Sequence, residues 1–312
     1  MGTVTAIIPS YGHHDLTHRA VEGLSRQTLR PDEIIVVDDG AQEPFRGDGG
    51  VRVIRHEVNR GFAAAVNTGL EATGTDLVAV LNNDVDLAPD WLERLVPVIS
   101  GRQADFVCGK LYRPDGRLDG TFDLLCRGGL AWRAGGGRVD GPLWSTAGPI
   151  LFTSFTAVLA TRAVFSEVGG LDESYHSYYE DVEWSLRAAI ANKTGYFEPA
   201  AHGIHTGSAT AGSWSYYSTR QLLRNHRRLA YQYFLPEFGR EYRIARTLLR
   251  AHCLNHGQWP DVPRETVASK PGRALLPEIL RRSEERLYQL QMGDGSPDRL
   301  WRWYFQLAGR MP

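Results

Sequence analysis

The sequence predicts an α/β protein with a doubly wound, mostly parallel sheet and a helical extension at its C-terminal end. Three observations support this class. Short apolar runs alternate with helical patterns over the first hundred residues, acidic residues follow several of these runs, and long Arg-rich helical patterns replace the alternation after about residue 212. Strands that alternate with helices are typical of a parallel sheet. We therefore expect one domain over residues 1–212 and a helical region packed on it over residues 213–312.

The expected elements follow in chain order. Strands are expected at 4–8, 33–37, 51–54, 76–81, 106–108 and 194–197, where short runs are apolar and rich in β-branched residues. Helices, with apolar residues on one face, are expected at 14–26, 61–72, 89–99, 161–168 and 183–191. The stretch from about 110 to 150 contains glycine clusters and predicts loops and short hairpins. Four longer helices are expected at 216–234, 240–256, 274–291 and 298–307.

Composition narrows the classes of function. A formal net charge of −1 gives no basic footprint for a nucleic-acid partner. No stretch approaches the roughly 18 consecutive apolar residues of a membrane span, and the first residues lack the basic region of a signal peptide. Three cysteines, Cys108, Cys126 and Cys253, match no zinc spacing and indicate a reducing compartment. We therefore expect a cytoplasmic protein.

Residues 80–86 read Val-Leu-Asn-Asn-Asp-Val-Asp and join a buried strand to a helix that begins near Pro89. Such a strand end places carboxamide and carboxylate oxygens at the carboxyl edge of the sheet, where open α/β sheets hold ligands. Hard cations prefer oxygen ligands and often keep substrate phosphates as the others. The segment is a candidate metal–diphosphate site. The alternative is a turn in which Asn and Asp only cap the following helix.

A second acidic strand end, Asp38-Asp39-Gly40, follows the strand at 33–37. Acidic ends of neighbouring strands would point into one crevice, where a carboxylate can accept from a base N–H or a ribose hydroxyl; an Asp-Gly turn is the alternative. The helix at 61–72 follows Asn59-Arg60-Gly61, and its small residues allow close packing. Neither a dinucleotide fingerprint nor a P-loop occurs, so a nicotinamide or flavin enzyme is disfavoured.

An acidic pair, Glu180-Asp181, follows two tyrosines at a predicted helix start. The helix dipole alone favours carboxylates there, but a general base also needs a carboxylate beside a substrate hydroxyl, and neighbouring aromatics suit a sugar face. Two histidines, His202 and His205, lie in an expected loop. One imidazole could complete an oxygen-rich metal shell, although a hydrogen-bonded histidine without a metal is the commoner case.

Taken in order, these segments resemble inverting glycosyltransferases of family 2, which have the GT-A fold of nucleotide-diphospho-sugar transferases. The likeness covers about residues 3–212, and its Asn-Asn-Asp segment is most similar to the rhamnosyltransferase-like branch. The matching segments are Ile7-Ile8-Pro9-Ser10-Tyr11, Ile35-Val36-Val37-Asp38-Asp39-Gly40, Asn59-Arg60-Gly61-Phe62 with Asn67 and Gly69, Leu81-Asn82-Asn83-Asp84, Val168-Gly169-Gly170-Leu171-Asp172-Glu173, and Glu180-Asp181 with Arg187.

The resemblance implies a role for each matched position. Asp181 would be the catalytic base, with Glu180 beside it, and Asp84 and His205 would bind Mn²⁺ or Mg²⁺. The first acid of the family's D-x-D motif is Asn82 here; Asp84-Val85-Asp86 offers a second frame, but the frame at 82–84 keeps the family's spacing. The nucleotide would contact Pro9, Ser10, Tyr11, Asp38, Asp39, Arg60, Asn67, Asn82 and Asn83, and the sugars Gly169, Gly170, Asp172 and Trp184.

The implied reaction moves a sugar from a UDP- or dTDP-sugar to an acceptor hydroxyl in a single displacement, with the cation assisting departure of the diphosphate. The acceptor would be a carbohydrate, a lipid-linked molecule or a small molecule, and a homodimer is a further expectation. The Arg-rich helices would form a solvated face or a peripheral membrane contact. A nucleotidyltransferase and a non-catalytic nucleotide- or sugar-binding module are the alternatives; the donor sugar, the nucleobase and the acceptor stay open.

Overall fold

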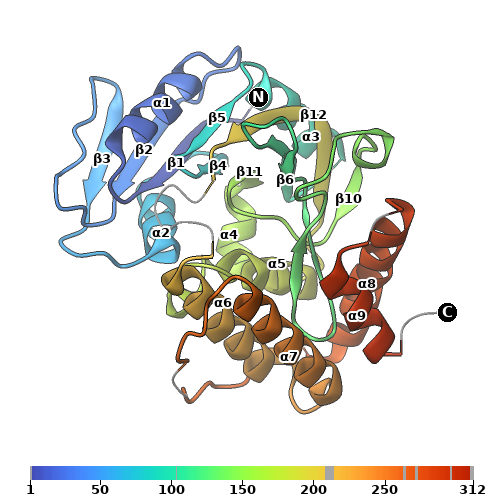
Figure 1. Cartoon of the computed structure of the whole chain (residues 1–312). Helices are drawn as coiled ribbons and strands as arrows, with labels where there is room; N and C mark the ends of the chain where they lie inside the picture. The colour runs from blue at the N-terminus through green and yellow to red at the C-terminus, as the bar shows by residue number, and fades with distance from the viewer. Residues whose placement is uncertain are drawn as a thin grey trace. The chain divides into compact units, whose positions relative to one another are not determined.

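The computed structural model describes residues 2–102, 104–207, 214–262, 265–270, 273–295 and 297–309 (Figure 1). It divides the chain into two compact units. The first contains Met1–Asp123 and Gly135–Thr210, and the second contains Leu124–Ala134 and Ala211–Pro312. The division near residue 210 lies close to the predicted boundary. However, the segment Leu124–Ala134, which the sequence assigned to the first domain, belongs to the second unit.

The first unit is built on a ten-stranded mixed sheet with the strand order β10-β12-β6-β11-β4-β1-β2-β3, while β5 pairs with β12 and β7 with β6. The strands β3, β2, β1 and β4 are parallel, as the sequence predicted. The unpredicted strand β11 runs antiparallel to both β4 and β6. The strand bounds are β1 Val4–Ser10, β2 Glu33–Asp38, β3 Val51–Arg55, β4 Leu77–Leu81, β5 Val85–Leu87, β6 Phe106–Tyr112, β7 Leu118–Gly120, β10 Gly148–Ile150, β11 Ala157–Thr161 and β12 Gly195–His205.

Helices cover both faces of this sheet (Figure 1). The helices α1 and α3 pack on one face, and α2 and α4, with α5 beside α4, lie on the other. Because both faces are buried, the strands are almost continuously apolar, which distinguishes them from half-exposed strands. The helix bounds are α1 His14–Ser25, α2 Phe62–Ala72, α3 Trp91–Arg102, α4 Arg162–Val168 and α5 Glu180–Ile190.

Side chains of β1 alternate between the two layers. Ala6 and Ile8 join the core formed with α1 and α3. Ile7 faces α2, where a Cβ atom added to Gly69 would lie 2.4 Å from the Ile7 side chain. Gly69 therefore permits the close approach of helix and sheet that the small residues of this segment suggested.

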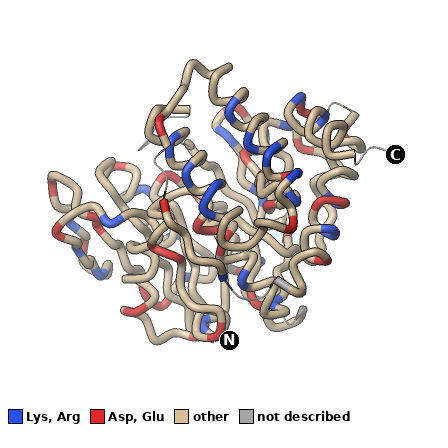
Figure 2. Tube along the Cα trace, turned by 90° about the horizontal axis from the view of Figure 1, so that it is seen from below, with Lys and Arg blue, Asp and Glu red and all other residues tan. Residues whose placement is uncertain are grey.

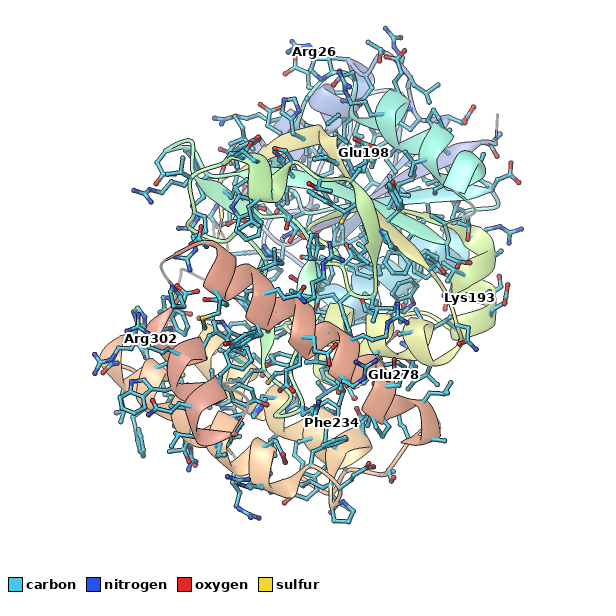
Figure 3. The ribbon with its side chains drawn as sticks, turned by 90° about the vertical axis from the view of Figure 1, so that its right-hand side faces the viewer. Arg26, Lys193, Glu198, Phe234, Glu278 and Arg302 are labelled. Carbon is cyan, nitrogen blue, oxygen red and sulfur yellow. The ribbon has the colours of Figure 1, made fainter. Side chains whose placement is uncertain are left out.

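The second unit is helical. Its helices are α6 Tyr216–Leu229, which continues into the π-helical turn η3 Ala230–Phe234, then α7 Gly239–Asn255, α8 Leu276–Gly293 and α9 Arg299–Leu307. Large aromatic side chains fill its core, including Tyr233, Phe234, Tyr304 and Phe305 (Figure 3 labels Phe234). All three cysteines of the chain, Cys108 in the first unit and Cys126 and Cys253 in the second, are buried and form no disulfide. Among the helices that the structure describes, none combines the length and apolar character needed to cross a membrane.

Hydrogen bonds explain why Leu124–Ala134 belongs with the helices. This segment contains β9 Ala131–Arg133 and most of β8 Asp123–Leu125. The backbone N–H of Gly128 donates to the Tyr304 hydroxyl (3.1 Å), and His226 Nε2 donates to the Gly128 carbonyl (2.9 Å). Burial lowers the pKa of His226 to about 3, so its imidazole is neutral in the fold. A glycine-rich sequence gives no signal of such partners about a hundred residues or more away.

Candidate active site

Three side chains that are distant in sequence meet beyond the end of β4. Asp84 follows β4, Asp119 lies in β7, and His205 ends β12. The strand pairing of β12 with β5 sets His205 opposite Val85, which brings it to the Asp84 loop. His205 Nε2 lies 3.2 Å from Asp84 Oδ1, and Nδ1 lies 2.8 Å from Asp119 Oδ2. The predicted loop at His205 is therefore a strand, and its pairing creates the cluster.

The two carboxylates determine the charge of His205. Burial alone would lower its pKa, but the hydrogen bonds to Asp119 and Asp84 outweigh burial and raise the pKa to about 9. All three side chains are largely buried, with exposed fractions of 10% for His205, 7% for Asp84 and 15% for Asp119. The cluster is consequently a charged, hydrogen-bonded unit rather than a set of independent surface groups.

The donor set suits a divalent cation only in part. Asp84 and His205 face each other, while Asp119 binds the opposite ring nitrogen, as carboxylates commonly do behind metal-bound histidines. Within the described residues, no group of three or more His, Cys, Asp and Glu could hold a metal ion by itself. A cation at Asp84 and His205 would thus need further oxygen ligands, which diphosphate and water can supply.

The two acidic frames of the strand end have different surroundings. Asp84 is buried and contacts His205, whereas Asp86 is exposed in β5 and lies beside Gly23 of α1. Asn83 is buried, and its Nδ2 donates to Thr17 Oγ1 (3.1 Å). Asp84 is therefore the buried acid beside His205, and its role as the metal candidate of the frame at 82–84 stays a prediction.

Asp38 and Asp39 are buried carboxylates that hold backbone segments. Asp38 accepts from the backbone N–H groups of Ala41 (3.1 Å) and Phe45 (2.9 Å) and from the Arg55 guanidinium. Asp39 accepts from the N–H groups of Arg60 (2.9 Å) and Gly61 (2.8 Å) and pairs with His56 (2.7 Å). These contacts fix the loop after β2 and the start of α2. A contact of either carboxylate with a nucleotide stays a prediction.

Three residues at the end of β1, Pro9, Ser10 and Tyr11, are predicted to contact the nucleotide, and one of the three side chains is exposed. Pro9 and Ser10 are buried in the strand, and Ser10 shares a hydrogen bond with Thr17 (2.8 Å). Tyr11, at 45% exposure, is accessible to a ligand. Of these three residues, Tyr11 is the one whose side chain could stack on a base without rearrangement.

Asn67 in α2 and Arg60 just before it are predicted to bind the nucleotide, and both contact the turn that is predicted to bind the sugar. Asn67 Oδ1 accepts from the N–H of Leu171 (2.8 Å), and its Nδ2 donates to the Leu171 carbonyl (2.9 Å). Arg60 forms an ion pair with Glu173 (3.1 Å). A Cβ atom at Gly170 would lie 2.4 Å from Asn67 Oδ1, so this contact requires glycine. Two segments a hundred residues apart are thereby fixed to each other.

The same turn is held from the other side by α5. Arg187 donates to the Gly170 carbonyl (2.7 Å) and forms a buried ion pair with Glu183 (2.9 Å). Trp184 Nε1 donates to the Gly169 carbonyl (3.0 Å). Asp172 caps the short helix Glu173–Tyr175 through the N–H of Ser174 (3.0 Å). Gly169, Gly170 and Asp172 thus have structural partners, and their predicted sugar contacts stay predictions.

The prediction that Trp184 faces a sugar is wrong. The side chain is fully buried, and its ring packs against Phe106, Phe155 and Phe165 at centroid distances of 5.6, 5.1 and 5.2 Å. A ring enclosed by three aromatic neighbours has no free face for a ligand. Its apolar side chain stabilises the core beneath α5, while its N–H holds the turn.

The acidic pair lies in the first turn of α5. Glu180 is 6% exposed, and its Oε2 has no hydrogen-bond partner among the described residues. Burial and the neighbouring Asp181 raise the pKa of Glu180 well above its ordinary value. Asp181 is half-buried and accepts from the N–H of Val182 (2.8 Å). The two carboxyl groups therefore differ in environment: Glu180 is buried, and Asp181 is the more accessible candidate base.

The backbone that leads to this pair is strained. His176, Tyr178 and Tyr179 have φ angles of 64°, 67° and 74°, which side chains other than glycine seldom adopt. The His176 carbonyl accepts from the N–H of Ala63 (3.2 Å). The imidazole ring of His176 occupies the space where a Cβ atom of Gly61 would lie. Strain of this kind persists where surrounding contacts impose it, and it gathers at functional sites.

Two residues of the candidate site, Glu183 and Asp119, were not predicted from the sequence. Glu183 could have been found, because its spacing of four residues from Arg187 on a helix is a recognised pairing distance. Asp119 could not, because it lies in the glycine-rich stretch between 110 and 150, where no pattern distinguishes it from other loop carboxylates. Only the pairing of β7 with β6, and of β6 with β12, brings it to His205.

The fold and the site define the class of protein. The mixed sheet and its covering helices have the GT-A fold of solved glycosyltransferases. Residues 5–159 match the Glycosyl transferase family 2 profile. The chain belongs to glycosyl transferase family 2, in its rhamnosyltransferase-like branch.

Relatives and structures agree with this assignment. An N-acetylglucosaminyl-diphospho-decaprenol L-rhamnosyltransferase of Mycobacterium tuberculosis is 28% identical over 244 residues, 67% of this chain and 77% of the relative. The structure of GalNAc-T7 with UDP, GalNAc and Mn²⁺ superposes with a TM-score of 0.64 at 15% identity over 98% of this chain and 56% of the other. A mannosyltransferase of Pyrobaculum calidifontis with GDP-Man and Mn²⁺ gives 0.56 at 16% identity over 99% and 86%. Two other curated relatives are matched over only 25% and 44% of their length.

Proposed function

We propose that this chain transfers a sugar from a nucleoside-diphosphate sugar, with UDP or dTDP as the nucleotide, to an acceptor hydroxyl with inversion. The observation that carries the proposal is the contact between Asp84 and His205, 3.2 Å apart although 121 positions separate them in the sequence. A carboxylate and an imidazole at the carboxyl edge of a sheet suit a cation bound together with a diphosphate. The relatives and the solved structures with Mn²⁺ and nucleotide sugars support the same reading.

The roles of the chain's own residues follow from their surroundings. Asp84 and His205 would hold Mn²⁺ or Mg²⁺, with Asp119 fixing the His205 ring. A bound cation would neutralise the charge that develops on the departing diphosphate. Asp181 accepts the proton of the acceptor hydroxyl as that oxygen attacks the anomeric carbon. Burial and the neighbouring Asp181 raise the pKa of Glu180, so the more accessible Asp181 is the member of the pair that we assign as the base.

The nucleotide and the sugars have separate candidate contacts. Tyr11, at the end of β1, is accessible for stacking on a base. Asn82, also at the sheet edge, is half-buried and suits the ribose or diphosphate. The turn at Gly169 and Gly170 suits the donor or acceptor sugar through its backbone. A lipid-linked acceptor is favoured by the relative that acts on a diphospho-decaprenol.

Release of nucleoside diphosphate tests the proposal directly. UDP- and dTDP-sugars are incubated with acceptor candidates, and the free nucleoside diphosphate is measured with Mn²⁺ and with chelator. We expect metal-dependent release that Asp84→Ala abolishes and that Asp86→Ala, in an exposed strand position, leaves largely intact. Binding without turnover would favour a non-catalytic binding module. Formation of sugar 1-phosphate and nucleoside triphosphate when pyrophosphate is added to the nucleotide sugar would favour a nucleotidyltransferase.

Calorimetry tests the nucleotide. We expect UDP or dTDP to bind more tightly than GDP or ADP in the presence of Mn²⁺, and EDTA to weaken binding. Equal affinity for the purine nucleotides, or affinity unchanged by EDTA, would remove the pyrimidine or the metal from the proposal.

A further inference from the structure

Positive charge gathers in one part of the second unit. The segment 214–262 contains eight arginines but only three acidic residues, a formal charge of +5, in a chain whose net charge is −1. Figure 2 shows Lys and Arg recurring along successive helical turns, with Asp and Glu sparse between them. The rest of the chain is consequently acidic, so α6 and α7 form a distinct basic region.

The exposed stripe of α7 has no acidic residue. Arg243, Thr247, Arg250 and Leu254 follow one another at spacings of four, three and four residues, which places them on one face of the helix, and all four are exposed. Within the described ranges, neither Arg243 nor Arg250 lies within ion-pair distance of a carboxylate. On α6, in contrast, Arg224 and Arg228 both pair with Glu265, at 2.6 and 2.7 Å. Arg243 and Arg250 thus differ from the paired arginines of α6.

Aromatic side chains accompany these arginines. The Arg250 guanidinium lies 5.8 Å from the ring centre of Trp259, which is 64% exposed. The Arg227 guanidinium lies 5.3 Å from the ring centre of Tyr231, which is 41% exposed. The rings of His226 on α6 and Tyr242 on α7 stack with 5.4 Å between their centres, so the two helices are neighbours. We call the set Arg227, Tyr231, Arg243, Arg250, Leu254 and Trp259 the α6–α7 face.

We propose that the α6–α7 face docks on the surface of an anionic lipid bilayer. Arginines without acidic partners are attracted to anionic headgroups, and Trp and Tyr favour the boundary between headgroups and acyl chains. The exposed Leu254, at 50%, and Trp259 add apolar area that a bilayer can bury. Binding to a nucleic-acid backbone would use the charges but not the exposed leucine. The proposal does not depend on the reaction proposed above.

Vesicle cosedimentation of the full chain tests the proposal. The vesicles contain phosphatidylcholine alone or phosphatidylcholine mixed with phosphatidylglycerol. We expect binding to the mixed vesicles that weakens with added salt, and little binding to phosphatidylcholine alone. Each arginine near an anionic surface contributes about fivefold to the partition coefficient, so Arg243→Glu combined with Arg250→Glu should lower it by roughly 25-fold or more. Trp259→Ala should weaken binding while preserving the salt dependence.

The matched control changes the same number of charges elsewhere in the second unit. Arg281 and Arg282 are exposed on α8, the helix on which Figure 3 labels Glu278. Arg281→Glu combined with Arg282→Glu should bind vesicles as the unaltered chain does. Donor hydrolysis to nucleoside diphosphate, measured without vesicles, should be equal in all these variants, which separates this proposal from the proposed function.

Several results would overturn the proposal. One is equal binding of the two double variants to the mixed vesicles. Another is equal binding of the unaltered chain to neutral and anionic vesicles. Tighter binding to a single-stranded RNA oligonucleotide than to vesicles would assign the face to nucleic acid. Self-association that the Arg243/Arg250 variant loses, with vesicle binding unchanged, would assign it to a second copy of the chain.

Discussion

Neighbouring residues of one helix turn have opposite environments at the candidate catalytic position. Glu180 is buried with an unpartnered oxygen, and its pKa is raised by burial and by Asp181. Asp181 is half-buried, and its carboxylate is favoured by the N-terminal end of α5. The difference in burial therefore makes Asp181, rather than Glu180, the carboxyl group that an acceptor hydroxyl can reach.

Substitution of Asp181 by Asn tests the base. Asn preserves size and most hydrogen bonding but cannot accept the proton, so transfer should fall roughly 10²–10⁴-fold. Donor affinity should barely change, because the base acts on the acceptor. Steady-state rates and calorimetry on the same preparation separate these effects. If Asp181 only caps the helix, the rate per folded molecule stays near that of the unaltered chain and stability falls by at most about 1 kcal/mol.

Substitution of Asp119 by Ala tests the fixation of His205. Asp119 binds His205 Nδ1 at 2.8 Å, and loss of such a partner behind a metal-bound histidine usually weakens metal affinity roughly 10- to 100-fold. Mn²⁺ affinity measured by electron paramagnetic resonance in the presence of UDP should therefore fall in Asp119→Ala. Asp140→Ala, which removes the carboxylate that pairs with Lys110, is the control for loss of a buried ion pair. Equal Mn²⁺ affinity in the two variants would exclude a role for Asp119.

At the scale of elements, side-chain hydrogen bonds hold the loops of the site to the neighbouring helices. Asp39 fixes the start of α2, Asn67 of α2 fixes the turn at Leu171, and Arg187 of α5 fixes the same turn from the other side. The chain segments that match the family in sequence are thus linked by hydrogen bonds to one another. This linkage explains how a strained segment before α5 can hold the acidic pair in one position.

The contact of α6 with the Gly128 segment predicts a pH dependence. His226 has a pKa of about 3 in the fold and about 6.5 when unfolded, so between these values only the unfolded chain binds the proton. Stability of the second unit should therefore decrease as pH falls below about 6.5, by up to roughly 1.4 kcal/mol per pH unit from this residue. His226→Gln, which keeps an N–H donor for the Gly128 carbonyl, should show a shallower decrease.

Urea unfolding followed by circular dichroism at several pH values measures this slope. His256→Gln, at the exposed residue that follows α7, is the matched control and should keep the original slope. A slope in His226→Gln identical to that of the unaltered chain would show that His226 is not the group responsible.

At the scale of the whole molecule, neither unit is a single continuous stretch of the chain, and the two units differ in architecture. The second unit takes Leu124–Ala134 from the middle of the first unit's sequence. In that segment the backbone N–H of Leu125 donates to Ser283 of α8 (2.8 Å), a residue of the same unit. A cut at residue 210 therefore does not separate two independent folding units.

Truncation after Thr210 should accordingly reduce solubility and lower the melting temperature, because it leaves Leu124–Ala134 without its partners. Replacing 124–134 by a short Gly-Ser linker in the truncated chain should restore solubility. Analytical gel filtration and thermal unfolding compare the two. A truncated chain that stays monomeric and melts cooperatively at the original temperature, with 124–134 intact, would contradict this account.

The sequence by itself determined the class of the fold and the family. Periodic apolar runs identify β1, β2, β4, α1, α2 and the long C-terminal helices, because burial on one or both faces imposes a local repeat. The acidic residues after β2 and β4 were also visible, because parallel strands end at one edge of a sheet. The sequence likewise identified Asp84 and His205 as partners, although only through the family likeness.

Only the tertiary structure decided which side chains meet. Asp119 joins His205 through strand pairing, Leu124–Ala134 joins the second unit through hydrogen bonds, and Trp184 is enclosed by aromatic rings rather than open to a sugar. None of these leaves a local pattern, because a contact between residues far apart in the chain depends on strand order and loop path. Local periodicity reports which face of an element is buried, and the packing of the elements determines what that face contacts.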